Sequence, residues 1–264
     1  MTTACHSLPP SLVVTREGPV AIIRLARAHK RNALDAATVE GLSEIFCAPA
    51  DGVKAFVLHG EGEHFCAGLD LGDVVDNDVT QGVHHSRLWH RAFGAIEFGP
   101  APVVSVLHGA VVGGGLELAA ATHIRVAERS TFYALPEGQR GIFVGGGGSV
   151  RIPRLIGVSR MQDMMLTGRT LGAEEGLALG LSHYLAEPGA GLARGIALAH
   201  RIAQNTGMTN FAVTHVLPRI ADSDPAAGYM MEALIAAIAA GDSEAKVRLA
   251  DFLAKRAAKV DHKA

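Results

Sequence analysis

Residues 108–157 read HGAVVGGGLELAAATHIRVAERSTFYALPEGQRGIFVGGGGSVRIPRLIG. Short β-branched runs alternate there with two glycine-rich turns, and a helix opens at residues 116–122 after the first turn. A strand that leads through a glycine-rich turn into a helix exposes backbone N–H groups that can bind an anion or a developing oxyanion. The stretch therefore predicts an α/β fold with an anion-binding corner.

The flanking sequence extends this pattern toward both ends of the chain. We expect a hairpin of strands at 11–16 and 20–25, a helix at 32–46, buried strands at 55–59 and 103–107, and strand-like segments at 123–127 and 132–137. Beyond residue 152 the pattern is mainly helical, at 159–166, 173–179, 192–205, 209–220, 225–240 and 243–259. We therefore expect an α/β core over residues 1–195 and a helical C-terminal region over residues 196–264.

Composition excludes several functional classes. The 264 residues carry 24 Lys and Arg against 26 Asp and Glu, and a net charge of −2 provides no bulk attraction to nucleic acid or an anionic membrane. No apolar run approaches the roughly 20 residues that a membrane-spanning helix needs, and the N-terminus does not resemble a secretory signal. The three cysteines, Cys5, Cys47 and Cys66, do not form a disulfide framework, so we expect a reducing, cytoplasmic location.

Common nucleotide, hydrolase and metal motifs are missing from the sequence. Neither a Gly-Lys-Ser/Thr phosphate loop nor a Gly-x-Ser-x-Gly nucleophile elbow occurs. Although the chain has 13 histidines, His84, His85 and His90 have no carboxylate at the spacing of a zinc site. Cys66 has no obvious base beside it, which favours a small buried side chain over a nucleophile.

Two glutamates flank the predicted anion-binding corner. Glu117 lies in the first turn of the helix after Gly113-Gly114-Gly115, and Glu137 follows Pro136 before the second glycine-rich loop. Two carboxylates beside an oxyanion site suit acid–base catalysis, provided that their surroundings separate their pKa values. From the residues alone, structural roles remain open: Glu117 could favour the helix dipole, and Glu137 could be an ordinary loop acid.

These motifs resemble the crotonase superfamily, the enoyl-CoA hydratases and isomerases. The resemblance covers roughly residues 12–256 and is most specific in Gly-Gly-Gly-x-Glu-Leu, in Pro-Glu 20 residues after the first glutamate, and in the following glycine-rich loop. FCAGLDL at 65–71 is similar to the family's Phe-x-Ala-Gly-x-Asp-Leu turn, and Arg27 with Asn32-Ala33-Leu34 is similar to its upstream segment. The resemblance implies a spiral of ββα units with a helical C-terminal part.

The resemblance also implies roles for individual residues. The N–H groups of Ala67 and Gly114 would bind the thioester oxygen, and Glu117 and Glu137 would form the catalytic pair. Coenzyme A would contact a short set of residues: Ala67, Gly68, Leu69, Asp70 and Arg31. The implied activity is the reversible hydration of 2-enoyl-CoA in fatty acid metabolism. Family members need no metal or redox cofactor. They form trimers or hexamers, so the resemblance implies a homotrimer or a dimer of trimers.

Several departures and alternatives bear on the substrate and the reaction. Gln139, Arg140, Phe143 and Val144 are unusual in the loop after Glu137 and could reshape the acyl pocket. A Δ3,Δ2-enoyl-CoA isomerase needs only one base, so it remains open beside hydration, as do other crotonase reactions that share the oxyanion hole. The charged run of Arg27, Lys30 and Arg31 could be a solvated surface instead of a CoA contact. A non-catalytic RNA-binding protein is a rival that the net charge of −2 disfavours.

Overall fold

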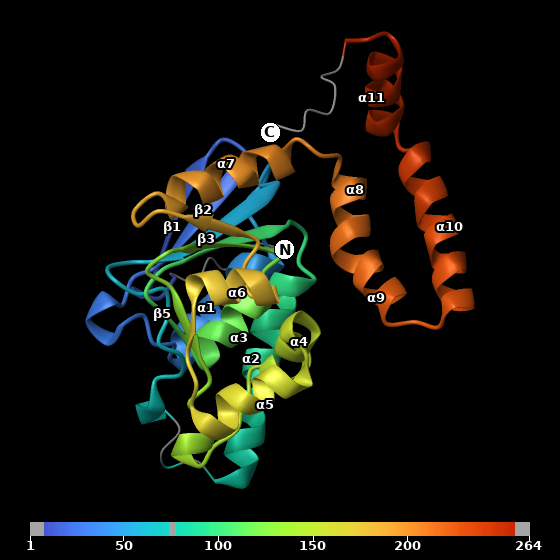
Figure 1. Cartoon of the computed structure of the whole chain (residues 1–264). Coiled ribbons are helices and arrows are strands. Elements are labelled where there is room, and N and C mark those ends of the chain that lie inside the picture. Colours follow the sequence, from blue (N-terminus) through green and yellow to red (C-terminus); the bar gives the residue numbers. More distant parts are fainter. Residues whose placement is uncertain (1–7, 74–75, 77, 257–264) are drawn as a thin grey trace. The chain divides into compact units, whose positions relative to one another are not determined.

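The computed structural model describes residues 8–73, 76 and 78–256, and the chain divides into two compact units, Met1–Ala203 and Gln204–Ala264 (Figure 1). The strands of the first unit are β1 Leu12–Glu17, β2 Val20–Leu25, β3 Ala55–Gly60, β4 Val103–Leu107, β5 Ala110–Val112, β6 Ile124–Glu128, β7 Phe132–Ala134, β8 Leu171–Gly172 and β9 Tyr184–Ala186. Its α-helices are α1 Ala36–Cys47, α2 Val79–Glu97, α3 Gly114–Ala120, α4 Gly148–Ile156, α5 Val158–Thr167, α6 Ala173–Leu179 and α7 Gly191–Ala203.

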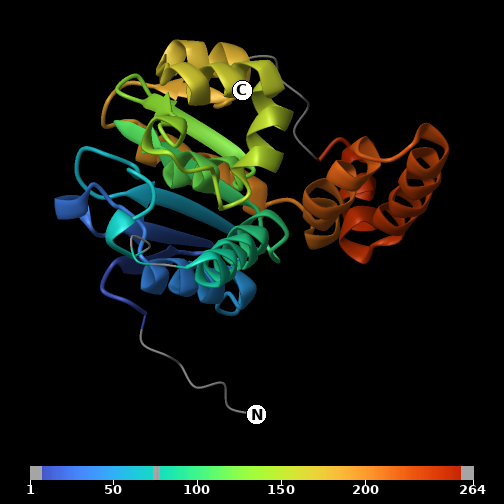
Figure 2. The ribbon, with the colours of Figure 1, turned by 90° about the horizontal axis from the view of Figure 1, so that it is seen from below.

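The main sheet has six strands in the order β1-β2-β3-β4-β6-β9. The pair β1–β2 is antiparallel, which confirms the predicted hairpin, and the remaining pairs are parallel. Strand residues alternate between two hydrophobic clusters, with Phe56 in one and Val57 in the other. Helices α1 and α2 supply side chains to the first cluster and α7 to the second, so both faces of the sheet are covered (Figure 2). The α/β fold is confirmed.

A second, three-stranded sheet in the order β5-β7-β8 carries the glycine-rich corner. Its strand β5 lies at residues 110–112, where the sequence predicts only a turn. The 65–71 turn joins this sheet through the bridge between Cys66 and Val111, and it contacts the N-terminal segment through the bridge between Leu34 and Leu69. These bridges bring three separate parts of the chain to one corner.

The predicted start of the first helix, at residue 32, is wrong. Helix α1 begins at Ala36 because the Asp35 side chain accepts the N–H of Thr38 and caps it. Asn32 instead has a left-handed φ of 56° and is buried. Its amide donates to the carbonyls of Glu61 (2.9 Å) and His64 (2.7 Å), so this side chain ties the segment before α1 to the turn that contains Phe65.

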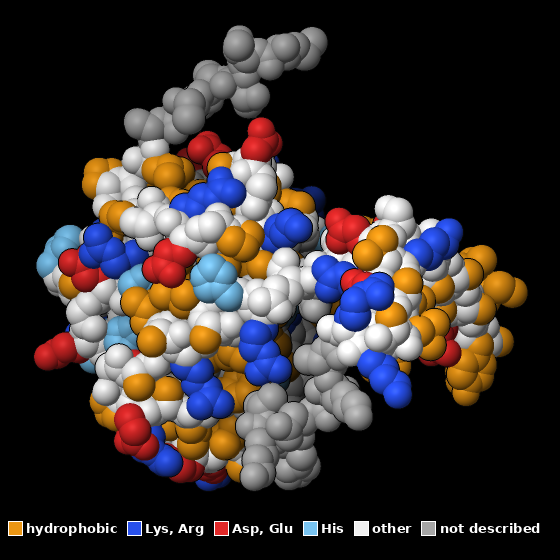
Figure 3. Space-filling view, turned by 90° about the horizontal axis from the view of Figure 1, so that it is seen from above, with side chains coloured by type: hydrophobic (Ala, Val, Ile, Leu, Met, Phe, Trp, Pro, Cys, Tyr) orange, Lys and Arg blue, Asp and Glu red, His pale blue; other side chains and the backbone are white. Residues whose placement is uncertain are grey.

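The second unit is helical, as the sequence predicts. It contains α8 Gly207–Phe211, a π-helical turn Ala212–Val216, α9 Leu217–Ala221, α10 Pro225–Gly241 and α11 Ser243–Leu253. The division between units lies after Ala203 and not at 195, because α7 packs its buried Ala199 and Ala203 on the main sheet. Large apolar side chains of the second unit are exposed (Figure 3), among them Phe211, Leu217, Tyr229, Met230, Leu234, Ile238 and Phe252. Its role in subunit packing stays a prediction.

Within the described residues, none of the helices has the length and apolarity that crossing a membrane requires.

Candidate active site

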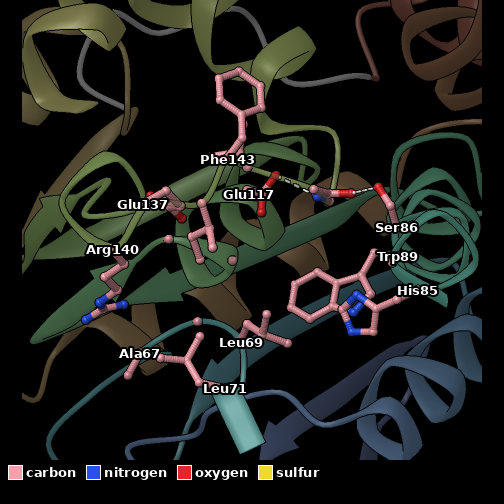
Figure 4. Close-up of a pocket in the computed structure, with 18 of the residues that line it drawn as sticks. Ala67, Leu69, Leu71, His85, Ser86, Trp89, Glu117, Glu137, Arg140 and Phe143 are labelled. Carbon is pink, nitrogen blue, oxygen red and sulfur yellow. Dashed lines mark hydrogen bonds between the residues drawn. The ribbon is translucent and has the colours of Figure 1, made fainter. Parts of the chain in front are cut away.

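A cavity of about 320 Å³ opens in the first unit between α2, the 67–71 turn, the start of α3 and the loop after Glu137 (Figure 4). Its wall combines apolar side chains with the two glutamates and glycine backbone. The lining residues used below are Ala67, Gly68, Leu69, Ser86, Trp89, Gly113, Gly114, Glu117, Glu137, Arg140, Phe143, Gly145 and Gly146. The structure thus brings the predicted glutamates and the predicted turn together in one site.

Glu117 projects from the first turn of α3 and is held by the second glycine-rich loop. Its Oε1 accepts the N–H of Gly146 at 2.8 Å and of Gly148 at 2.7 Å. The side chain is 3% exposed, and burial raises the pKa of Glu117, while the two N–H donors act in the opposite direction. Oε1 accepts both hydrogen bonds, so Oε2 accepts neither of them.

Glu137 follows β7 and is buried, with one of its two carboxylate oxygens left without a donor in the described part of the chain. Among the described residues, its Oε2 has no hydrogen-bond partner. Burial raises the pKa of Glu137 to about 6, and the nearby Glu117 carboxylate adds to this effect, while the residue's own backbone N–H acts in the opposite direction. Its Oε1 lies so close over Gly113 that a Cβ on that glycine would approach within 2.6 Å. Glu137 therefore lies beside the start of α3. Its surroundings favour the protonated carboxylic acid more strongly than water does.

Of the two backbone N–H groups predicted to bind the substrate oxygen, the prediction for Ala67 is wrong, whereas Gly114 lies in the cavity wall. The N–H of Ala67 donates to the carbonyl of Arg31 at 2.9 Å, so it is not free to bind a substrate oxygen. The N–H of Leu69 has no acceptor among the described residues, because the bridge to Leu34 uses the Gly68 carbonyl and the Asp70 N–H instead. Leu69, not Ala67, therefore supplies the free donor of the turn.

The free N–H of Leu69 lies beside that of Gly114, the first residue of α3. A Cβ on Gly114 would lie 3.3 Å from Leu69 N, and a Cβ on Gly68 would lie 3.0 Å from Gly114 N. Gly68 has a φ of 96°, which glycine adopts without strain. The two glycines thus permit a close approach of two chain segments and place two N–H donors at one end of the cavity.

Of the residues predicted to contact coenzyme A, Ala67, Gly68 and Leu69 line the cavity, whereas Asp70 and Arg31 do not. Asp70 pairs with Arg27 (3.0 Å) and Lys30 (3.3 Å), and the hydrogen bond from Arg27 lowers the pKa of Asp70. Arg27 also donates to the carbonyl of Ala33, so these charges hold the turn to the preceding segment. Arg31 is exposed, has a φ of 51° and is not part of the cavity wall. Its contact with coenzyme A stays a prediction.

The sequence reasoning missed the residues that hold Glu117. Gly146 and Gly148 donate to its carboxylate, and Trp89 packs so closely that a Cβ on Gly114 would lie 2.7 Å from the indole. The run of four glycines at 145–148 was the available signal, since a Cβ on Gly146 would lie 2.9 Å from Trp89 and one on Gly148 would lie 2.7 Å from Glu117. Trp89 is 2% exposed and belongs both to the hydrophobic core and to the cavity wall.

The unusual residues after Glu137 divide between the cavity and the surface. Arg140, Phe143 and Val144 line the cavity, and Phe143 is exposed at its mouth. Gln139 points elsewhere and donates to the carbonyl of Thr167 at 3.4 Å. Cys66 is fully buried, which confirms the prediction of a small buried side chain, and burial raises the pKa of its thiol to about 12. In the described part of the chain, no three His, Cys, Asp or Glu side chains gather as a metal site.

The sequence of this chain also matches the model of a known protein family. Residues 15–258 match the family model described as "Enoyl-CoA hydratase/isomerase". The chain belongs to the enoyl-CoA hydratase/isomerase family. Members of this family act on acyl-CoA thioesters, and the two sheets with a helical C-terminal part are the crotonase fold.

Individual members of this family are similar in sequence to this chain over most of its length. A crystal structure described as a "putative enoyl-CoA hydratase" from Rhodopseudomonas palustris CGA009 shares 53% identity and a TM-score of 0.91, with 95% of this chain and 97% of that one covered. The Bacillus subtilis protein named "Putative enoyl-CoA hydratase/isomerase YngF" is 30% identical over 84% of this chain and 86% of its own length. The "Short-chain-enoyl-CoA hydratase" of Clostridium acetobutylicum is 28% identical over 74% of this chain and 76% of its own.

The raised pKa of Glu137 predicts a pH-dependent cost in stability. A carboxyl whose pKa is about 6 in the folded state and about 4.3 in the unfolded state stabilises the fold fully below about pH 4 and loses this contribution as the pH rises through 6. The loss amounts to about 2 kcal/mol. We therefore expect Glu137→Gln, which cannot ionise, to gain about 2 kcal/mol relative to the wild type between pH 4 and pH 8.

Urea unfolding at pH 4, 6 and 8 measures this difference. Glu40→Gln, at an exposed position of α1, is the control and should show no such change with pH. A difference between Glu137→Gln and the wild type that stays constant from pH 4 to pH 8 would contradict the raised pKa.

Proposed function

We propose that the chain is an enoyl-CoA hydratase, which adds water reversibly across the 2,3 double bond of a 2-enoyl-CoA thioester. The observation that carries this proposal is that two carboxylates and two free N–H donors share one cavity. Glu117 is bound by two N–H groups, whereas Glu137 has an oxygen without a partner. Two acids in such different surroundings suit a reaction that needs one base and one acid at the same time.

Each part of the corner has a task in this reaction. The N–H groups of Leu69 and Gly114 would hold the thioester oxygen, on which negative charge develops when water attacks C3. Glu117, whose Oε1 is held by two N–H donors that offset part of the effect of burial, would remove the proton from that water. Glu137, whose surroundings favour the carboxylic acid, would deliver a proton to C2. One C–O bond and one C–H bond form as the double bond is lost, and the reverse sequence is dehydration.

Both catalytic roles are carried by side chains of this chain. The mechanism as written needs no metal or redox cofactor. A cytoplasmic location stays a prediction from the cysteine content, and assembly as a homotrimer or a dimer of trimers stays a prediction from the family resemblance. The name of the Clostridium acetobutylicum relative supports hydration, since that protein is called a short-chain-enoyl-CoA hydratase.

Incubation with crotonyl-CoA tests the proposal. We expect loss of the enoyl-thioester absorbance and formation of 3-hydroxybutyryl-CoA, with one oxygen from solvent when the reaction runs in H₂¹⁸O. A parallel incubation with 3-hexenoyl-CoA tests the isomerase alternative. Conversion of the 3-enoyl thioester to the 2-enoyl thioester, with no hydration of either compound, would replace hydration by isomerisation.

A further inference from the structure

One peptide group connects Ser86 to Glu117. The carbonyl of Gly145 accepts the Ser86 Oγ–H at 2.5 Å, and the N–H of Gly146 donates to Glu117 Oε1 at 2.8 Å. The carbonyl of residue 145 and the N–H of residue 146 belong to the same planar peptide unit. Figure 4 shows the two bonds in line across the cavity wall, from Ser86 through the loop to Glu117. Rotating that plane would break both bonds together.

This loop has little stiffness of its own. Residues 145–148 are four consecutive glycines, and Gly147 has a φ of 94°. Glycine populates left- and right-handed conformations about equally, so alternative orientations of the 145–146 peptide plane cost little unless another group selects one. The loop cannot gain stiffness from side chains either, because a Cβ on Gly146 would lie 2.9 Å from Trp89 and 3.0 Å from Phe93.

Helix α2 supplies the contacts that hold the loop. Ser86 binds the carbonyl of Gly145, and Arg151, which is paired with Glu97 at the end of α2 (2.7 Å), donates to the carbonyl of Gly146 at 3.1 Å. Two successive carbonyls are therefore fixed by α2, directly or through Arg151. Of these two contacts, only that of Ser86 acts on the peptide unit that donates to Glu117.

Ser86 lies in a part of α2 that is anchored on both sides. Asp78 and Gln81 form a capping box at the start of α2, and the buried Trp89 anchors the next turn. One turn after Ser86, His90 Nε2 lies 3.5 Å from Ser86 Oγ. Apart from the bond to Gly145, the described residues thus give this hydroxyl only one long contact.

We propose that Ser86 is a positioning residue for Glu117, acting through its hydrogen bond to the Gly145 carbonyl. The inference rests on the proposed role of Glu117 in hydration. The bond selects the orientation of the 145–146 peptide that aims the Gly146 N–H at the carboxylate. Because a peptide polarised at its carbonyl is also a better donor at its N–H, the same bond strengthens the contact with Glu117.

Removal of the hydroxyl has two expected consequences. Glu117 loses the firm placement of one of its two donors, and a loosely placed catalytic group costs rate, so we expect Ser86→Ala to lower kcat by about 10- to 100-fold. KM for crotonyl-CoA stays within about threefold because Ser86 does not act on the substrate. A weaker donor also raises the pKa of Glu117 further, so the acidic limb of the kcat profile moves to higher pH.

The experiment compares Ser86→Ala, Ser86→Thr and Thr80→Ala with the wild type. Thr retains the hydroxyl and restores most of the rate, whereas Thr80, exposed in the first turn of α2, is the matched control and leaves it unchanged. Steady-state kinetics from pH 5 to pH 9 give the rates. Hydrogen exchange of a peptide spanning residues 144–151, followed by mass spectrometry, reports the loop independently of the reaction, and Ser86→Ala is expected to exchange at least about tenfold faster there.

Three results would overturn the proposal. They are an unchanged kcat in Ser86→Ala, an increase in KM alone with unchanged exchange, and no rescue by Ser86→Thr. If Ser86→Ala fails to fold, Ser86→Cys, which keeps the size but donates weakly, carries the same test. A wild type that hydrates no enoyl-CoA refutes the proposed function instead, while the exchange of the 144–151 peptide still decides whether Ser86 holds the loop.

Discussion

Glu117→Gln is expected to lower kcat for the hydration of crotonyl-CoA by a factor of about 10² to 10⁴. The glutamine keeps the size of the side chain, and its oxygen can still accept from Gly146 and Gly148. It cannot take a proton from water, however, so the loss measures the base alone. Glu137→Gln is expected to lose a similar factor, because the amide is too weak an acid to deliver a proton to C2.

Steady-state kinetics with crotonyl-CoA measure both losses. Glu40→Gln, a neutralising change on the exposed side of α1, is the control and is expected to keep the wild-type rate. Hydration that survives Glu117→Gln within about threefold would remove this residue from the mechanism. Retention of isomerisation by Glu117→Gln, together with its loss in Glu137→Gln, would favour a single-base reaction.

Gly68→Ala is expected to lower kcat by a factor of about 10² to 10³, the cost of one lost oxyanion donor. Gly68 has a φ of 96°, and a Cβ there would lie 2.7 Å from the carbonyl of Val112 and 3.0 Å from Gly114 N. The 67–71 turn must therefore move away from α3. Such a movement separates the N–H groups of Leu69 and Gly114, while the contacts of Glu117 with its glycine loop are left in place.

Gly72→Ala is the matched control for this substitution. Gly72 directly follows the 67–71 turn, but a Cβ there finds its nearest neighbour, Asp70 Oδ1, at 3.6 Å, which is ordinary contact. Circular dichroism and thermal unfolding establish that Gly68→Ala is folded before the rates are compared. A folded Gly68→Ala variant with a kcat close to that of the wild type would show that the two N–H groups do not bind the reacting oxygen.

The two glutamates and the backbone donors differ in how far the sequence predicted them. Glu117 stands two residues after three glycines that open a helix, so local pattern and family resemblance both indicate it. The donor pair required Leu69 in place of Ala67, because the N–H of Ala67 is bound by the carbonyl of Arg31, 36 residues earlier in the chain. A partner so distant leaves no trace in the local sequence.

The three-stranded sheet beside the site shows the same limit of prediction from local sequence. Residues 110–112 have the appearance of a turn between glycines, and they become strand β5 only by pairing with β7, 22 residues further along. The start of α1 was misplaced for a related reason, since Asn32 has its carbonyl partners at Glu61 and His64. Elements with local caps or strong periodicity, such as the N-terminal hairpin and α10, lie where the sequence predicts them.

The sequence by itself determined the α/β class, the helical C-terminal unit, the family and the two glutamates, because burial patterns, glycine turns and short motifs are properties of neighbouring residues. Only the tertiary structure decided which N–H groups are free, which glycines bind Glu117 and why Ser86 matters to them. These are hydrogen bonds between segments far apart in the chain, and such a bond exists only after packing has brought its donor and its acceptor within reach of each other.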